Sequence, residues 1–272
     1  MNILQIFGVI IIVVLLVIAC FPKKKKSEYV ISYDFQNPTK NMILPENLKE
    51  ISGLSFYKEN QLACVNDEKG NVFIYDLQQE SIVEKIEIGK KGDYEGIEVV
   101  DNEIFIMKSN GKIKGFKMGS EQERKIDCTH PDVLEYEGLG YNSATRSLLL
   151  VTKERVKDKN DKKVIYAYNL EKETLTKNIS ISEEMTKGDD GKKAFAPSGI
   201  AVHPLTGELY VISSQGKKLL ILSATGEKLA LVALDESLFL QPEGICFTPN
   251  GDLYISSEGE KGEGYILKFA SK

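Results

Sequence analysis

The stretch that decides the fold is QPEGICFTPNGDLYISSE, residues 241–258. It begins with a turn, continues as a short apolar strand, reverses at Asn250-Gly251-Asp252 and ends as a second strand with an acidic tip at Glu258. Two β-branched and aromatic runs joined through an Asn-Gly pair are typical of a β-hairpin. Altered copies of this pattern occur four more times upstream, so the chain repeats one β unit.

Each copy is marked by a glycine that follows a serine or a glutamate. The five glycines are Gly53, Gly96, Gly138, Gly199 and Gly244, and they are 43, 42, 61 and 45 residues apart. A period of about 40–45 residues built from short strands predicts a β-propeller in which each repeat forms one four-stranded blade. Two polar insertions, 154–163 and 183–193, account for the long third spacing. We therefore expect an all-β, five-bladed propeller over residues 29–272, with a six-bladed ring as the alternative.

The last repeat is one strand short. It ends soon after its third strand, residues 265–269, whereas the segment 28–35 near the start of the chain has no repeat of its own and reads as a strand. We expect this N-terminal strand to complete the fifth blade and to close the ring. Closure would remove the free sheet edges that otherwise promote aggregation.

Residues 1–21 form a candidate signal or anchor segment. The run 6–21 is almost continuously apolar and nearly long enough to span a bilayer, which predicts an uncleaved membrane anchor. Val17-Ile18-Ala19-Cys20 is similar to a lipobox, and we favour this lipoprotein signal, in which Cys20 carries the lipid anchor, over the uncleaved anchor. Residues 22–28, with four lysines, would be a basic tether along anionic headgroups. We expect attachment to a membrane of the bacterial cell envelope with the propeller on the periplasmic or extracytoplasmic side, although the positive-inside rule alone would keep the lysines in the cytoplasm.

Charge narrows the range of partners. The net charge of the chain is −5, but residues 27–272 carry 31 basic and 40 acidic side chains, a balance of −9. Nucleic-acid binding requires clustered lysine and arginine, so an acidic body argues against nucleic acid and is compatible with cations. We expect a monomer, and a protein partner remains open.

The propeller topology predicts which side chains meet at one mouth of the central channel. One set precedes the marker glycines at the start of each inner strand: Ser52, Glu95, Glu137, Ser198 and Glu243. The other set lies at the ends of second strands: Asp67, Lys108, Lys153, Glu154 and Glu258. We expect the ten side chains to form one pocket.

Within this pocket we predict a divalent cation, Ca²⁺, bound by Glu95, Glu137 and Glu243, with Asp67 and Glu258 as further ligands. Carboxylates that converge on a narrow axis either raise one another's pKa or are neutralised by a cation. Oxygen ligands without histidine or thiolate favour Ca²⁺ or Mg²⁺. Two alternatives stay open: the glutamates only cap strand starts, or Lys108 and Lys153 pair with them.

The repeats, taken in order, resemble the SdiA-regulated (YjiK-like) family, whose relatives include calcium-regulated β-propeller proteins. The resemblance covers residues 29–270 and rests on these motifs: ISGL at 51–54, NDE at 66–68, YEGI at 94–97, YEGL at 136–139, SGIAVHP at 198–204 and QPEGI at 241–245. It implies a membrane-attached or exported propeller linked to Ca²⁺ and loosely similar to phytases. The neutral Ser213-Ser214-Gln215 departs from the family's acidic pattern in the fourth blade.

Three functions follow from these observations. The first is a non-catalytic module that binds the cation. The second is a hydrolase that acts on a phosphoester or a sugar through the same carboxylates, either as acid and base or through bound Ca²⁺. The third is a protein-interaction scaffold without a small ligand. His203, in a turn on the opposite face, is expected to cap that turn, and no G-x-S-x-G motif indicates a hydrolase triad.

Overall fold

The computed structural model describes residues 29–155, 163–188, 194–259 and 262–271. The chain divides into two compact units, Met1–Val30 and Ile31–Lys272, and the second unit holds the described strands. The predicted signal or anchor segment 1–21 with Cys20 and the tether 22–28 lie outside the described residues. Of the helices in the described part of the chain, none is long and apolar enough to cross a membrane.

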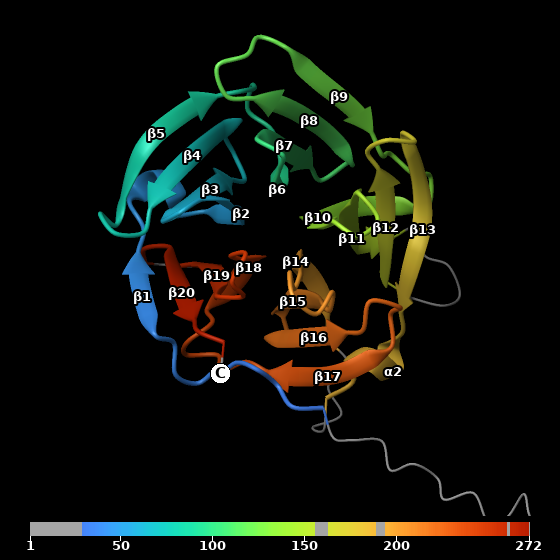
Figure 1. The fold of residues 1–272 in the computed structure, drawn as a ribbon. Helices are drawn as coiled ribbons and strands as arrows, with labels where there is room; N and C mark the ends of the chain where they lie inside the picture. The colour runs from blue at the N-terminus through green and yellow to red at the C-terminus, as the bar shows by residue number, and fades with distance from the viewer. Residues whose placement is uncertain (1–28, 156–162, 189–193, 260–261, 272) are drawn as a thin grey trace, which may run out of the picture. The chain divides into compact units, whose positions relative to one another are not determined.

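The unit Ile31–Lys272 consists of five antiparallel four-stranded sheets arranged around one axis (Figure 1). Blade 1 contains β2 (Ile51–Lys58), β3 (Gln61–Asn66), β4 (Asn71–Asp76) and β5 (Ser81–Glu87). Blade 2 contains β6 (Tyr94–Val100), β7 (Glu103–Lys108), β8 (Lys112–Lys117) and β9 (Glu123–Asp127). Blade 3 contains β10 (Val133–Asn142), β11 (Ser147–Arg155), β12 (Lys163–Asn169) and β13 (Thr174–Ile181).

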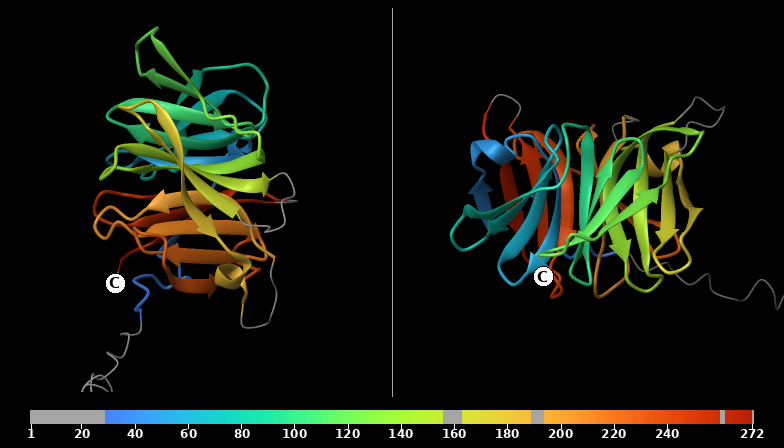
Figure 2. Two further views of the ribbon diagram at one scale, coloured as in Figure 1. Left: turned by 90° about the vertical axis from the view of Figure 1, so that its right-hand side faces the viewer. Right: turned by 90° about the horizontal axis from the view of Figure 1, so that it is seen from above.

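Blade 4 contains β14 (Ala196–Val202), β15 (Leu209–Gln215), β16 (Lys218–Leu222) and β17 (Lys228–Ala233). Blade 5 contains β18 (Gln241–Phe247), β19 (Leu253–Glu258), β20 (Tyr265–Phe269) and β1 (Lys40–Ile43). A 3-10 turn, η1 (Glu46–Leu48), and one turn of helix, α2 (Glu183–Thr186), complete the described elements. Figure 2 shows the ring from two other sides, with strands running between two faces and loops on both. The prediction of five blades is confirmed.

An N-terminal strand closes the ring, as predicted, but the predicted strand 28–35 is wrong. The closing strand is β1, which pairs antiparallel with β20 so that Lys40 lies opposite Lys268 and Ile43 opposite Tyr265. Within 28–35, the described residues have no strand structure, and Tyr33 is buried instead. Its hydroxyl donates to the Gly251 carbonyl at 2.6 Å. The alternation of apolar residues in this segment thus reflects packing against the ring rather than sheet pairing.

The core consists of layers between neighbouring blades. Successive side chains of a strand point to opposite faces of the sheet, and therefore toward the blade on one side or the other. Val65 and Ile74 of blade 1 accordingly pack with Ile97 and Ile106 of blade 2. Equivalent layers occur between blades 2 and 3, between blades 3 and 4, and between blades 5 and 1. Each blade buries both of its faces against its neighbours. The facing sides of blades 5 and 1 are therefore covered only when the ring is closed.

The marker glycines lie where the inner strands approach one another most closely. A Cβ atom on Gly199 would lie 2.4 Å from the Glu243 carbonyl oxygen of the next blade, and one on Gly138 would lie 2.8 Å from the Gly199 Cα. Gly138 also has a φ of +99°, which favours glycine. Side chains at these positions would push the blades apart, which explains why a glycine recurs in every repeat.

The turn between β14 and β15 is capped by His203, as expected. The amides of Leu205 and Thr206 both donate to its Nδ1 at 3.2 Å. Its Nε2 lies 2.9 Å from the Tyr33 hydroxyl, and the ring is buried. His203 is therefore a structural residue that joins the N-terminal segment to blade 4.

Closure by β1 gives a test of the architecture. Met42 is fully buried in the layer between blades 5 and 1, whereas its neighbour Ile43 is 50% exposed. We expect Met42→Ala to lower the free energy of unfolding by about 2–5 kcal/mol, the usual cost of truncating a buried side chain to alanine. Ile43→Ala, the matched control, should change it by about 0.5 kcal/mol or less. Urea unfolding followed by circular dichroism measures both, and equal small losses would show that stability does not depend on β1.

Candidate cation site at the channel mouth

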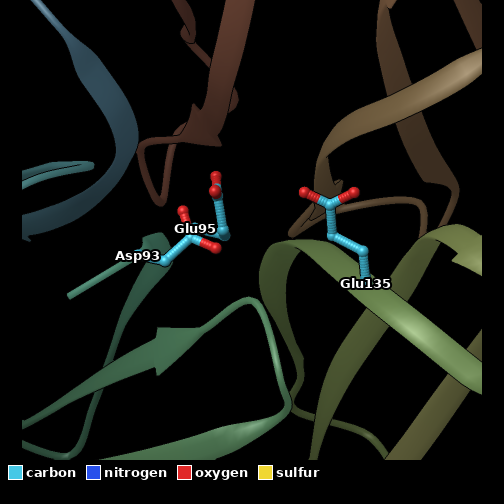
Figure 3. Close-up of side chains that lie close together, drawn as sticks. All are labelled: Asp93, Glu95 and Glu135. Atoms are coloured by element: carbon cyan, nitrogen blue, oxygen red, sulfur yellow. The ribbon is translucent and has the colours of Figure 1, made fainter.

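Three carboxylates from two blades meet at one end of the channel. Asp93 directly precedes β6, Glu95 lies on β6 and Glu135 lies on β10; one oxygen atom of each lies within 4.8 Å of the other two. Figure 3 shows the Glu95 and Glu135 carboxylates facing each other across the mouth, with Asp93 beside Glu95. Oxygen ligands about 2.3–2.6 Å from a Ca²⁺ ion can be up to about 5 Å apart, so this spacing fits one ion.

Only Glu95 of these three residues was a candidate from the sequence. The missed residues belong to a motif repeated in blades 2 and 3, Asp93-Tyr94-Glu95-Gly96 and Glu135-Tyr136-Glu137-Gly138. Both tyrosines are buried, and their hydroxyls donate to the carbonyls of Lys90 at 2.9 Å and Cys128 at 3.0 Å. Since strand neighbours point to opposite sides, anchoring each tyrosine between blades turns its flanking acids toward the axis.

Glu137 and Lys153 form an ion pair beside this cluster. Glu137 is 4% exposed and accepts a hydrogen bond from the Lys153 ammonium, which also lies 3.6 Å from Glu135. Burial lowers the pKa of Lys153, but the carboxylates of Glu137, Glu135 and Glu95 outweigh it and hold the pKa above its usual value. Burial raises the pKa of Glu137 to about 7 although Lys153 opposes the rise. The alternative in which a lysine pairs with the acids therefore applies to Lys153.

The remaining predicted ligands extend the acidic region over four blades. Burial, then the charge of Glu137, raises the pKa of Glu95 to about 9. Burial, then Glu137 and Glu258, raises the pKa of Glu243 well above its usual value. Burial is the main cause that raises the pKa of Glu258 to about 7, and the negative charge of Asp67 adds to it. Burial also raises the pKa of Asp67, with a smaller contribution from the charge of Glu50. The charges of these residues thus act on one another, but among the described residues Glu95 is the one predicted ligand in the close group with Asp93 and Glu135, and Glu137, Glu243, Asp67 and Glu258 lie outside that group.

The two predicted pocket serines connect blades. The Ser52 hydroxyl donates to the Tyr94 carbonyl and the Ser198 hydroxyl to the Pro242 carbonyl, each at 2.7 Å. Both serines are buried. Each therefore joins its inner strand to the inner strand of the next blade, at the position where blades 2, 3 and 5 carry a glutamate.

Two further predicted pocket residues lie away from the cluster. The Lys108 ammonium lies over the Tyr94 ring, 4.8 Å from its centre, on the side of β6 that faces blade 1. Glu154, opposite Glu135 in the β10–β11 register, is exposed. The mouth thus contains fewer cationic groups than the sequence suggested, because Lys108 is not among them.

Below the mouth the channel is almost filled. A cavity of about 10 Å³ lies among the inner strands, lined by Glu95, Glu243, Ser52 and Ser198 together with the marker glycines. This volume is about that of one water molecule. The axis therefore has room for a single ion or water and not for an organic molecule.

The fold and this mouth define the class: a five-bladed β-propeller whose channel opens into a cluster of partly neutralised carboxylates. A family model described as SdiA-regulated matches residues 27–261, and the chain belongs to the SdiA-regulated family. The resemblance inferred from the motifs is confirmed. No curated protein matches the chain significantly.

Solved structures share the fold at low sequence identity. A chain of the nidogen/laminin complex has a TM-score of 0.52 at 16% identity, covering 76% of this chain and 72% of that one. The luciferin-regenerating enzyme has a TM-score of 0.52 at 11% identity and 86% and 96% coverage. Streptogramin B lyase has a TM-score of 0.51 at 14% identity and 85% and 97% coverage. These likenesses establish propeller architecture only.

The raised pKa values predict how stability depends on pH without metal. A carboxyl whose folded pKa is raised binds more protons in the folded chain than in the unfolded one, so stability falls as pH rises from about 4.5 to the folded pKa. For Glu95 this window extends to about 9. In EDTA we expect the Tm to be lower at pH 8.5 than at pH 6, with a smaller drop in Glu95→Gln.

The variant should retain part of the drop, because burial also raises the pKa of Glu98, further along β6, to about 7. Glu84→Gln, at an exposed position on β5, is the control and should behave as the wild type. Differential scanning calorimetry measures the three proteins. Identical Tm changes in all of them would show that Glu95 does not carry this proton linkage.

Proposed function

We propose that this propeller binds a divalent cation, Ca²⁺, at the acidic mouth, with Asp93, Glu95 and Glu135 as the nearest ligands. The observation that carries the proposal is the approach of these three carboxylates to within 4.8 Å of one another. Glu137, Glu243, Asp67 and Glu258 supply further negative charge and candidate oxygen ligands. A bound cation would offset the burial and the repulsion that raise their pKa values.

The chemistry of the donors supports Ca²⁺. The cluster offers carboxylate oxygens, which hard cations prefer, and none of its members is a histidine or a cysteine. Ligands supplied by two blades and their loops suit the flexible coordination of Ca²⁺ better than the strict octahedron of Mg²⁺. Lys153 neutralises part of the charge, so we expect weak binding, with a dissociation constant of about 0.1–1 mM, as in extracellular modules.

A hydrolase or a pure scaffold has less support. Phosphate would require cationic groups at the mouth, yet Lys153 is already paired with Glu137 and lies near Glu135. The channel below the mouth has about 10 Å³ of free volume, room for one ion or water, so it offers no pocket for an organic substrate. Turnover of phytate or nitrophenyl glycosides that disappears in Glu137→Gln would favour the hydrolase, and recovery of one protein partner irrespective of chelator would favour the scaffold.

Calcium titration tests the proposed site. We expect the purified full-length chain to release or absorb heat with millimolar CaCl₂ and to gain Tm, more at pH 8 than at pH 6 because protons compete for the same oxygens. Asp93→Asn, Glu95→Gln and Glu135→Gln should each weaken binding by about tenfold, or about 1.4 kcal/mol. Glu84→Gln is the matched control. The absence of heat and of any Tm gain would exclude the site, whereas equal binding by all variants would place it elsewhere.

We further propose that the chain is attached to a membrane of the bacterial cell envelope and that the propeller faces the extracytoplasmic side. The apolar run 6–21 and the lipobox-like residues ending at Cys20 support attachment. A propeller outside the cytoplasm would meet Ca²⁺ at the concentrations that weak sites require.

The mode of attachment can be tested at Cys20. If Cys20 is acylated, cells fed a clickable palmitate analogue should label the wild-type chain, and Cys20→Ser should abolish the label because the serine offers no thiol. Cys246→Ser is the control, since Cys246 is buried in the propeller. Unlabelled wild-type protein that still sediments with membranes would favour the uncleaved anchor, and wild-type protein free of membranes would contradict attachment.

A further inference from the structure

A second cavity lies away from the axis, between blades 1 and 2. It has a volume of about 700 Å³, within the range of small-molecule sites. The loop after β5 forms one wall, with Ile88 and Gly89, and blade 2 forms the other, with Tyr94 and Ile106. Ile88, Tyr94 and Ile106 are buried apolar or aromatic residues of the layer between these blades. We call this cavity the lysine wedge.

The name reflects its charge. Five lysines line the cavity: Lys90, Lys108, Lys112, Lys114 and Lys125. The acidic residue among the lining side chains is Asp127, whose carboxylate accepts hydrogen bonds from the Thr129 amide at 3.0 Å and hydroxyl at 2.7 Å. This concentration of cations occurs in a body with a balance of −9, so the wedge is a local feature and not part of a basic surface.

The sheet register forces some of these charges together. Lys114 on β8 lies directly opposite Lys125 on β9, so both side chains are on the same face of blade 2. Like charges directly opposite each other destabilise a strand pair. Lys114 is compensated by an ion pair with Glu123 at 2.5 Å. Among the described residues, no ion pair compensates Lys90 or Lys125, whereas Lys112 lies directly opposite Asp127 in the β8–β9 register.

The combination of charge, apolar wall and volume specifies a ligand class. Low-dielectric walls concentrate the field of charges that line a cleft, which favours an anion. An inorganic anion would fill little of about 700 Å³ and would leave most of the accessible lining, which is predominantly apolar, uncovered. A ligand that carries an anionic head and an apolar body would pair with the lysines and also cover the apolar part of the accessible lining, as in most small-molecule pockets.

We propose that the lysine wedge binds a small organic anion with an alkyl or aryl body, a carboxylate or a phosphate monoester. The head would lie near Lys112 and Lys125, and the body would fill the remaining volume of the cavity, along the methylene chains of the lining lysines. This site is separate from the cation site, because Tyr94 and the acids Asp93 and Glu95 point to opposite sides of the same strand.

Lysine footprinting tests the proposal on the purified full-length chain. The protein is acetylated with N-hydroxysuccinimidyl acetate in the presence of decanoate or decyl phosphate, each below its micelle concentration, and every lysine is quantified by mass spectrometry. We expect Lys112 and Lys125, both exposed, to lose reactivity severalfold. Lys177 and Lys228, exposed on β13 and β17, should be unaffected. Protection by one amphiphile and not the other would identify the head group as carboxylate or phosphate.

Two further arms make the result decisive. Protection by inorganic phosphate equal to that by decyl phosphate would overturn the proposal, because the apolar body would contribute nothing. Protection only by vesicles of phosphatidylglycerol would overturn it in favour of a membrane-facing surface, and no protection by any of these would also overturn it. Lys112→Gln with Lys125→Gln should weaken decanoate binding by about tenfold in calorimetry, whereas Lys177→Gln with Lys228→Gln should not.

Discussion

The approach of five inner strands to a common axis is the constraint on which the rest of the structure depends. At four of the five marker glycines a Cβ atom would lie less than 3.0 Å from the backbone of the next blade, and at Gly53 the nearest backbone atoms lie at 3.2 Å. The residue before the marker glycine lines the narrow channel in four of the five blades, and in three blades it is a glutamate. Burial and mutual repulsion then raise the pKa values of Glu95, Glu137 and Glu243. The geometry that closes the ring thus also creates the demand for a neutralising cation or proton.

Repetition made the fold predictable from the sequence. Five copies of one hairpin pattern specify the blade number regardless of where each strand begins, and a missing fourth strand in the last copy specifies closure by the N-terminus. The identity of that strand was not predictable from alternation alone. The segment 28–35 alternates because Tyr33 packs against blades 4 and 5, whereas the true closing strand, β1, has only Met42 buried and carries a weak pattern.

The site was predictable in part. The sequence did not reveal the register of the first and second strands of each blade, which decides the side of the sheet on which a side chain lies. In blade 2, Lys108 lies opposite Tyr94; in blade 3, Thr152 lies opposite Tyr136. Lys153 is therefore offset by one residue from the position of Lys108. Because strand side chains alternate with a period of two, one residue moves a lysine from one side of the sheet to the other. Lys153 consequently pairs with Glu137 and lies near Glu135, whereas the Lys108 ammonium lies over the Tyr94 ring. The two lysines nevertheless look equivalent in the sequence.

The same alternation keeps two opposite charges apart along a single strand. Asp93 and Glu95 point toward the axis, whereas Tyr94 between them points toward the lysine wedge, and the Lys108 ammonium lies on its ring. If the wedge lysines reached the axis, they would neutralise the carboxylates and leave no site for a cation. If the acids turned outward, the wedge would lose its charge. The buried tyrosine, fixed by its bond to the Lys90 carbonyl, maintains the separation on which both proposed sites depend.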